Sequence, residues 1–359
     1  MKIFKTILCA ITITFFMSPA NAAKYEFSIV SVSDTSNTFW QGIQKGMDAA
    51  CEMINSWGQD EVDCILVYNQ ENGNVPMELE TVETIVRQGT DGLAVHIVND
   101  DMFDDIMAEC IEGGQICLAT NVDDSEGAAG NARLSMTGQD LYRAGYELVK
   151  GLAPQFPDGP VHVLFGLSAP GQSWAEARIN GGIEYMEEYK AANPDREVTW
   201  DKIDSGMDTS LTGQRVCSYI QGAPETTAYF DAGFWGAGAG TCLRDLGYEP
   251  GQLLMGMFDI VEIVLDEMRQ GYVHLTVDQQ PFYQGFLPIL QMYFMNKYGL
   301  SAFDVNTGKA LLYPADIMDP EFQKFVEKGD IIVSLKNENI IAPFAGIIGK
   351  REIAQGVLG

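Results

Sequence analysis

Residues 27–40 have the sequence FSIVSVSDTSNTFW, and this stretch decides the fold expected for the chain. Its apolar first part, Phe27–Val32, has the composition of a buried strand, and residues 41–54 carry apolar side chains at helical spacing. A polar loop with two adjacent aromatic residues at its end joins the two elements. Open α/β sheets bind ligands at the carboxyl ends of their strands. We therefore expect this loop to hold a small polar molecule with Asn37, Phe39 and Trp40, although packing in the core is an alternative role for Trp40.

The same alternation of strand and helix continues along the chain. Strands are expected at residues 62–68, 92–97 and 115–120, with helices at 76–88 and 102–112 between them. A second alternating set covers residues 142–277, and a long helix is expected at 281–298. This order predicts an α/β protein with two lobes, each a doubly wound (Rossmann-like) parallel sheet, and a cleft between them. Residues 316–359 have no clear place in this scheme.

The first 22 residues have the pattern of a signal peptide. Lys2 and Lys5 precede an apolar run at 7–17, which is too short to cross a bilayer, and Ala20-Asn21-Ala22 is a small-x-small cleavage pattern. We expect cleavage after Ala22 and export to the periplasm. The net charge of −28 comes with no basic patch, which argues against nucleic-acid binding. The acidity favours solubility, with a cationic ligand or partner surface as the alternative.

The cysteines are informative because the chain is expected to be exported to a compartment where disulfides form. The chain has 7 cysteines, and Cys9 lies in the signal segment. An even number is left, which in an exported chain predicts disulfides. Short loops close at low entropic cost, so we favour the sequence-local pairs Cys51–Cys64, Cys110–Cys117 and Cys217–Cys242; buried free thiols are the alternative. No Cys-x-x-Cys motif occurs and only three histidines are present, so we expect no metal.

Sequence signatures of enzymes are missing. The chain has no Gly-x-Ser-x-Gly motif and no phosphate-binding Gly-x-x-x-x-Gly-Lys loop. The glycine-rich segment 233–240 fits a dinucleotide fingerprint poorly, because its spacing is wrong and two aromatics interrupt it. We therefore expect no cofactor and no enzymatic activity. The alternative, an exported carbohydrate enzyme, would need paired carboxylates across a cleft, such as Asp259 with Asp123 or Asp34.

Polar and aromatic side chains instead gather at the ends of the expected strands. The polar ones have planar amide, carboxylate or guanidinium groups: Asn37, Asn121, Arg178, Asp259 and Gln279. The aromatic ones near them are Phe39, Trp40, Trp174, Phe234 and Trp235. Adjacent sugar hydroxyls are met in pairs by such planar groups, and the C–H faces of the ring pack on aromatic planes. Each polar residue taken alone is better explained as a structural group or a helix cap, and it is their joint placement at strand ends that favours a ligand site.

With these residues in view, the chain resembles a periplasmic solute-binding protein of the ribose/galactose type, the type I sugar-binding component of an ABC transporter. The resemblance covers about residues 27–300 and is carried by short motifs: Ser36–Trp40, Asn121, Ala175-Glu176-Ala177-Arg178, Phe258-Asp259 and Asp278-Gln279-Gln280-Pro281. It implies that Asn37, Asn121, Arg178, Asp259 and Gln279 bond ligand hydroxyls and that Phe39 stacks on the ring. Gly233, Val122 and Trp174 depart from the polar residues usual in that family, so we expect a less polar pocket.

The resemblance also implies a three-segment hinge and a mode of action. It places the signal peptide at 1–22, an N-terminal lobe at 23–135 plus 280–311, and a C-terminal lobe at 136–279 plus 312–359. The implied function is capture of a monosaccharide, polyol or sugar acid by lobe closure and delivery to a membrane permease, by a protein that acts as a monomer. The alternative is a sensor that presents a sugar-like signal, such as autoinducer-2, to a chemoreceptor or sensor kinase.

Overall fold

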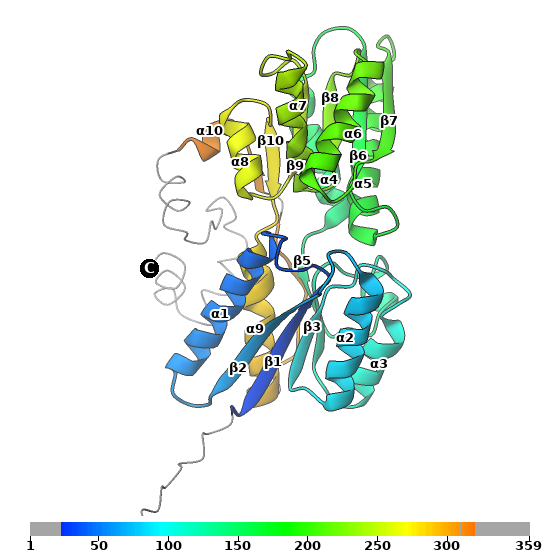
Figure 1. The fold of residues 1–359 in the computed structure, drawn as a ribbon. Helices are drawn as coiled ribbons and strands as arrows, with labels where there is room; N and C mark the ends of the chain where they lie inside the picture. The colour runs from blue at the N-terminus through cyan, green and yellow to red at the C-terminus, as the bar shows by residue number, and fades with distance from the viewer. Residues whose placement is uncertain (1–22, 309, 320–359) are drawn as a thin grey trace, which may run out of the picture.

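The computed structural model describes residues 23–308 and 310–319, and its core consists of two six-stranded sheets (Figure 1). The first sheet has the strand order β11-β5-β4-β3-β1-β2. Its strands are β1 (Tyr25–Ser31), β2 (Val62–Tyr68), β3 (Gly92–Val95), β4 (Cys117–Asn121), β5 (Met136–Gly138) and β11 (Val305–Asn306). It is covered on one face by α1 (Trp40–Ser56) and α9 (Pro281–Tyr298), and on the other by α2 (Val75–Gln88) and α3 (Asp104–Glu112).

The second sheet repeats this plan with the order β12-β10-β9-β8-β6-β7. Its strands are β6 (Val161–Leu167), β7 (Val198–Asp204), β8 (Ala228–Asp231), β9 (Leu254–Phe258), β10 (Leu275–Asp278) and β12 (Ala310–Leu312). Its helices are α4 (Leu141–Leu152), α5 (Ser173–Ala192), α6 (Thr209–Gly222), α7 (Ala239–Asp245), α8 (Glu262–Arg269) and α10 (Pro314–Ile317). The strand pairs of the described residues run parallel, apart from β10 with β12. We call the two units the first lobe and the second lobe.

This architecture confirms the fold class predicted from the sequence, two doubly wound α/β lobes. The bounds of β2 and α9 are those expected from the apolar pattern. The strands that the pattern missed are β5, β11 and β12, each only two or three residues long. A strand of this length has too few side chains to show an alternation of period two.

Three connections carry the chain between the lobes, and short strands lie beside the first and the third. β5 pairs with β4 up to Gly138, so Met136, where the first crossing was expected, is still part of the first sheet. The second connection is Gln279-Gln280, between β10 and α9. The third lies between β11 and β12, and Leu311-Leu312, its expected position, pairs with β10 in the second sheet. These short strands fasten the connecting segments to the sheet edges.

A close helix pair covers each sheet, and glycines allow the close approach. A Cβ atom on Gly46 of α1 would lie 1.9 Å from the carbonyl oxygen of Phe282 in α9, and one on Gly285 would lie 2.0 Å from that of Ile43. In the second lobe, a Cβ on Gly145 of α4 would lie 1.8 Å from the carbonyl oxygen of Arg178 in α5. Any larger residue at these positions would push the two helix backbones apart.

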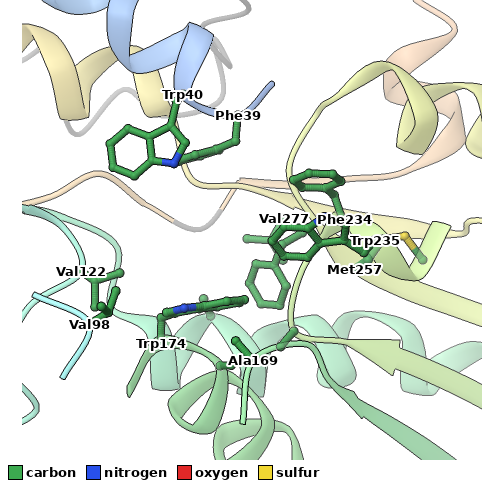
Figure 2. Close-up of a cluster of buried hydrophobic side chains, with 14 of the residues drawn as sticks. Phe39, Trp40, Val98, Val122, Ala169, Trp174, Phe234, Trp235, Met257 and Val277 are labelled. Carbon is green, nitrogen blue, oxygen red and sulfur yellow. The ribbon is translucent and has the colours of Figure 1, made fainter. Parts of the chain in front are cut away.

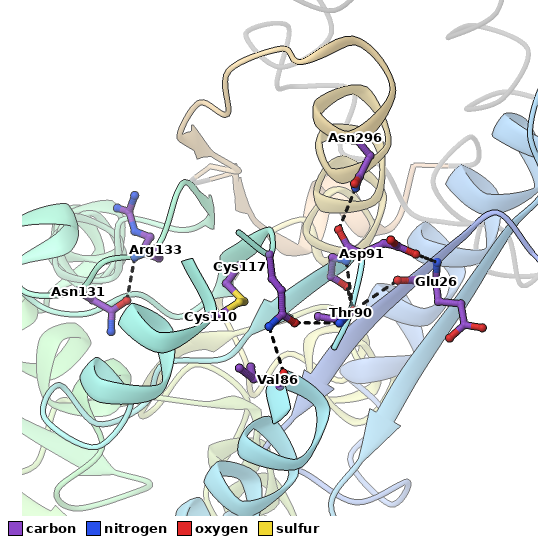
Figure 3. Close-up of a disulfide and its surroundings, with 11 residues drawn as sticks. Glu26, Val86, Thr90, Asp91, Cys110, Cys117, Asn131, Arg133 and Asn296 are labelled. Atoms are coloured by element: carbon purple, nitrogen blue, oxygen red, sulfur yellow. Dashed lines mark hydrogen bonds between the residues drawn. A yellow bond between two sulfur atoms is a disulfide. The ribbon is translucent and has the colours of Figure 1, made fainter. Parts of the chain in front are cut away.

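The cysteines lie in the three pairs favoured from the sequence. The Cα atoms of Cys51 and Cys64 are 6.2 Å apart, those of Cys110 and Cys117 6.3 Å, and those of Cys217 and Cys242 6.4 Å. These separations are within the range that a disulfide spans. Figure 3 shows the Cys110–Cys117 pair, which links α3 to β4. Beside it, the Gln115 side chain accepts from the backbone of Thr90 (2.8 Å) and donates to that of Val86 (3.1 Å).

Two expectations from the sequence concern residues that the structure does not describe. The signal peptide with its cleavage point at Ala22, and residues 320–359 of the segment that had no clear place, lie outside the described residues. Among residues 23–308 and 310–319, the helices are all too short or too polar to cross a membrane.

Candidate functional site

A cavity lies between the two lobes, at the carboxyl ends of their strands, and its empty space is about 510 Å³ when the part open to solvent is included. The side chains that the sequence singled out come from both lobes and all line it: Asn37, Phe39, Trp40, Asn121, Trp174, Arg178, Phe234, Trp235, Asp259 and Gln279. Parallel strands bring their carboxyl ends to one sheet edge, and two facing edges bring residues far apart in sequence together.

Aromatic rings form much of the cavity wall. Figure 2 shows Phe39 and Trp40 on one side, with Trp174, Phe234 and Trp235 facing them. The rings of Phe234 and Trp235 stack with centroids 4.3 Å apart, and Trp174 lies 6.2 Å from Trp235. Trp40 is 2% exposed and packs edge-on against His96 at 5.2 Å, so it serves the core as well as the cavity. The other rings leave flat apolar faces beside the cavity.

Arg178 is the buried cation of the site. It lies on α5, and its guanidinium donates through Nη1 to the carbonyl oxygen of Ala232 (2.8 Å) and through Nη2 to Oε1 of Gln139 (3.1 Å). Its Nε has no hydrogen-bond partner among the described residues. Burial lowers the pKa of Arg178 to about 10, which leaves the side chain charged at neutral pH. The guanidinium also lies 3.9 Å from the ring centroid of Phe258. One strong donor is therefore unused within the protein.

Asp259 supplies the matching anion at the end of β9. Its backbone is left-handed (φ 73°), as is that of Asn121 (φ 65°) at the end of β4. Asn and Asp are the residue types that tolerate this conformation best after glycine. Burial raises the pKa of Asp259, while Arg178 and a 2.6 Å hydrogen bond from Nε2 of Gln279 favour the ionised carboxylate. The two strand ends thus turn sharply and direct these side chains to the cavity.

The two asparagines of the site already have hydrogen bonds within the protein. Nδ2 of Asn121 donates to Oε1 of Gln279 (3.1 Å) and to Oε1 of Gln284 (2.8 Å). Nδ2 of Asn37 donates to Oγ of Ser33 (3.1 Å), and its Oδ1 accepts from the backbone of Phe39 (3.1 Å). These hydrogen bonds use both N–H groups of Asn121 and one of the two N–H groups of Asn37, and the amide oxygens retain capacity as acceptors.

The mouth of the cavity is bridged by direct contacts between the lobes. The backbone N–H of Ser173 donates to the carbonyl oxygen of Val98 (3.1 Å), and Nε2 of Gln172 approaches that of Gly73 (3.5 Å). A Cβ on Gly73 would lie 2.6 Å from Cε of Met207 in the second lobe. The lobes thus touch each other at these points beside the cavity.

The sequence did not indicate some of the lining residues. His96 directly follows β3, so the strand-end rule that selected Asn121 would also have found it. Gln172 and Met207 lie in loops before α5 and α6, and no local pattern marks them. Gln284 lies one helical turn after the second connection and contacts only protein groups. No group of three acidic, histidine or cysteine side chains that would hold a metal occurs in the part of the chain described.

With the geometry established, comparison with known proteins identifies the family. The family model described as a periplasmic binding protein domain matches residues 28–297. The chain belongs to the periplasmic binding protein family.

A curated relative of this periplasmic binding protein is the xylose/arabinose-binding protein of Sulfolobus acidocaldarius, 27% identical over 272 residues. The match covers 72% of the present chain and 63% of the relative, which is less than two thirds of its length.

Solved structures share the fold of this periplasmic binding protein. A periplasmic sugar-binding protein from Legionella pneumophila superposes with a TM-score of 0.70 at 22% identity, covering 79% of this chain and all (100%) of that one. A solute-binding protein from Agrobacterium vitis with bound D-fucose superposes with a TM-score of 0.72 at 16% identity, covering 83% of this chain and 98% of that one. A carbohydrate transporter from Acidothermus cellulolyticus 11B in complex with myo-inositol superposes with a TM-score of 0.70 at 21% identity, covering 85% of this chain and 99% of that one.

Proposed function

We propose that this protein captures a monosaccharide, or a related polyol or sugar acid, by closure of its lobes and delivers it to the permease of an ABC transporter. The observation that carries the proposal is the interlobe cavity, in which flat aromatic faces surround a buried arginine and a buried carboxylate. Hydroxyl groups bond well to such charged planar groups, and the C–H faces of a sugar ring pack on aromatic planes. The names of the relatives support the same class of ligand.

The charge balance of the cavity favours a neutral ligand within this class. Arg178 and Asp259 carry opposite charges, and both side chains are buried. A neutral sugar or polyol would leave this balance unchanged. The carboxylate of a sugar acid would add a buried charge without a partner, which is costly. We therefore expect aldoses and polyols to bind more tightly than sugar acids.

We assign roles to the lining residues on the same basis. Arg178 donates to the ligand through Nε, and Asp259 accepts from a hydroxyl through the oxygen that Gln279 does not hold. Asn37 and Asn121 accept through their amide oxygens, and Gln279 lines the hinge side. The aromatic residues stack on or enclose the ring: Phe39, Trp40, Trp174, Phe234 and Trp235.

The proposal includes the setting in which the protein works. We propose that it is exported to the periplasm after cleavage behind Ala22, that it acts as a monomer, and that its three cysteine pairs are disulfides. The lobes would turn about the three connections near residues 138, 279 and 308, and the closed form would dock on the permease. No feature of the cavity favours the alternative of a sensor for a chemoreceptor.

A thermal-shift screen of the mature protein tests the proposal. The compounds are pentoses, hexoses, polyols, sugar acids and, as a control class, amino acids. A ligand that binds only the folded state raises the melting temperature by mass action. The proposal predicts a shift with at least one neutral sugar or polyol, and recovery of that compound unchanged after incubation. A shift with amino acids alone, or chemical conversion of the sugar, would contradict it.

A further inference from the structure

Gly233 forms part of the cavity wall, between β8 and the aromatic pair Phe234-Trp235. A Cβ atom added to it would lie 2.5 Å from Cε3 and 2.5 Å from Cζ3 of the Trp235 indole ring. Carbon atoms in contact are normally about 3.5–4.0 Å apart, so this ring occupies the space that a side chain at residue 233 would need. The backbone does not require glycine here, because φ −137° and ψ −173° are extended values that any residue adopts. What glycine supplies at this position is therefore room for the Trp235 ring.

Buried hydrogen bonds hold the backbone beside the ring in place. The N–H of Gly233 donates to Oδ1 of Asp231 (2.9 Å), and the carbonyl oxygen of Ala232 accepts from Nη1 of Arg178 (2.8 Å). Asp231 is 0% exposed, and its carboxylate also accepts from two hydroxyl groups, those of Ser168 and Tyr229. Because this backbone is anchored on both sides, a side chain at residue 233 would displace the Trp235 ring rather than the chain.

The Trp235 ring is one of three aromatic rings that close the cavity on the side of the second lobe (Figure 2). It stacks on Phe234 with ring centroids 4.3 Å apart, and the centroid of Trp174 lies 6.2 Å away. The guanidinium of Arg178 lies 5.5 Å from the Trp174 ring centroid, so the group that holds Ala232 also borders this wall. Gly233, Phe234 and Trp235 offer no polar side-chain atom except the indole N–H. A part of a ligand that meets this wall is therefore selected mainly by its size.

We propose that Gly233 is a positioning residue and that, through the Trp235 ring, it limits the size of the sugar that the cavity accepts. This inference rests on the proposed function, because it concerns the same cavity and the same class of ligand. An apolar pocket discriminates between ligands that differ by one methylene group by about 10- to 200-fold. The exocyclic hydroxymethyl group of a hexopyranose is a difference of this kind, since the corresponding pentopyranose lacks it.

The position of the ring is tested without any ligand, by ¹⁹F NMR of the mature protein labelled with 5-fluorotryptophan. The chain has 5 tryptophans, and Trp235→Phe assigns the signal of Trp235. Gly233→Ala is expected to shift this signal and to leave those of Trp57 and Trp200 in place. The matched control is Gly222→Ala at the end of α6, where an added Cβ would meet nothing within 4 Å, and it should shift none of them. An unmoved Trp235 signal in Gly233→Ala overturns the proposal.

Thermal unfolding of a double variant keeps this test decisive. Gly233→Ala should lower the melting temperature of the wild type by more than it lowers that of Trp235→Leu, because leucine leaves room for the added methyl group. Equal losses in the two backgrounds overturn the steric link. If Gly233→Ala alone does not fold, folding of Gly233→Ala with Trp235→Leu supports the proposal, and failure of this double variant to fold overturns it.

The effect on the ligand is measured by calorimetry with two pairs of sugars, D-xylose with D-glucose and L-arabinose with D-galactose. The members of each pair differ only by the hydroxymethyl group. Trp235→Leu is expected to raise the affinity for the hexose relative to its pentose by about tenfold. Gly233→Ala should weaken binding of the preferred sugar about tenfold in the wild type, and no further when residue 235 is leucine. Unchanged hexose-to-pentose ratios, or equal losses in both backgrounds, overturn the role in selection.

Failure of this inference is distinguishable from failure of the proposed function. If the wild type binds none of the four sugars but binds another carbohydrate or polyol in the thermal-shift screen, selection of pyranoses by size is overturned and the proposed function stands. If the whole carbohydrate and polyol screen is negative, the proposed function fails as well. The ¹⁹F signal of Trp235 decides in either case whether Gly233 positions the ring.

Discussion

The two lobes share a core plan but present different groups to the cavity between them. In each, a six-stranded sheet is covered by a helix pair that glycines bring into close contact. The first lobe offers the Phe39 ring and two asparagines, of which Asn121 has both amide N–H groups bonded within the protein and Asn37 has one. The second lobe offers the unpartnered Nε of Arg178 and the carboxylate of Asp259. The difference teaches that polar recognition is concentrated in the second lobe, and the first lobe supplies apolar cover.

The largest effect that this comparison predicts is at Arg178. Arg178→Lys keeps the charge but loses the guanidinium fork and Nε, so we expect about 100-fold weaker sugar binding by calorimetry, from loss of a charge-assisted hydrogen bond worth about 1.5–3 kcal/mol. Arg143→Lys, on the exposed side of α4, is the control and should bind normally. Normal binding by Arg178→Lys would mean that the second lobe does not supply the main donor.

A smaller loss is expected when Asp259 loses its charge. Asn tolerates the left-handed backbone (φ 73°) of this position, so Asp259→Asn should fold as the wild type does. A neutral acceptor replaces a charged one, and we expect about tenfold weaker binding. The measurement is the dissociation constant for a neutral sugar, with circular dichroism as the check on folding. Tighter binding of the sugar by this variant would exclude a hydroxyl contact at Asp259.

The first lobe should show a weaker dependence on its aromatic cover. Phe39 is 7% exposed at the cavity, so Phe39→Ala should lower affinity about fivefold through lost ring contact. Trp40→Ala should instead lower the free energy of unfolding by about 3–5 kcal/mol, because the ring fills the core. Urea unfolding and ligand titration of both variants separate the two roles. Equal effects on stability would contradict the distinction between them.

The smallest effect concerns Asp278, a buried carboxyl at the end of β10 beside the hinge that is also influenced by the charge of Asp259. Burial raises its pKa to about 7, above the value of the unfolded chain, so the native state retains a proton that the unfolded state loses. Stability therefore falls as pH rises from about 4 to about 7, and the full cost is present above that. Asp278→Asn, which still accepts from the backbone of Gln280, should raise the melting temperature by about 5 °C at pH 8 and by less at pH 5. A larger gain at pH 5 would contradict the sign of this shift.

The sequence predicted most of the fold because its elements are long and regular. Apolar periodicity indicates helices such as α9 and strands such as β2, and alternation of the two implies parallel sheets. The convergence of Asp259 and Asn121 followed from the rule for strand ends, whereas Arg178 lies on α5 and was indicated by the motif of the family resemblance. The hydrogen-bond partners of each site residue could not be predicted in the same way. Both N–H groups of Asn121, for example, bond to Gln279 and Gln284. These residues are 158 and 163 positions away in the sequence, so no local pattern indicates the bonds.

The short strands and the burial of Glu78 could not be predicted from the sequence, because both depend on neighbouring elements. β5, β11 and β12 form because neighbouring strands offer free hydrogen-bond edges, and three side chains cannot reveal this. Glu78 has the helical spacing of a residue near the start of α2, where an acid is expected on an exposed face. Its burial depends on where that helix packs against the first sheet, which no local pattern records.

Gln279 belongs both to the cavity wall and to one of the three connections between the lobes. Its side chain bonds Asp259 of the second lobe and Asn121 of the first, and its backbone oxygen accepts from Gln284 and Thr307. Contact with the ligand and the angle between the lobes are therefore mechanically linked at a single residue. Under the proposed function, a substitution of Gln279 that changes affinity for the sugar would therefore also change how long the protein holds it.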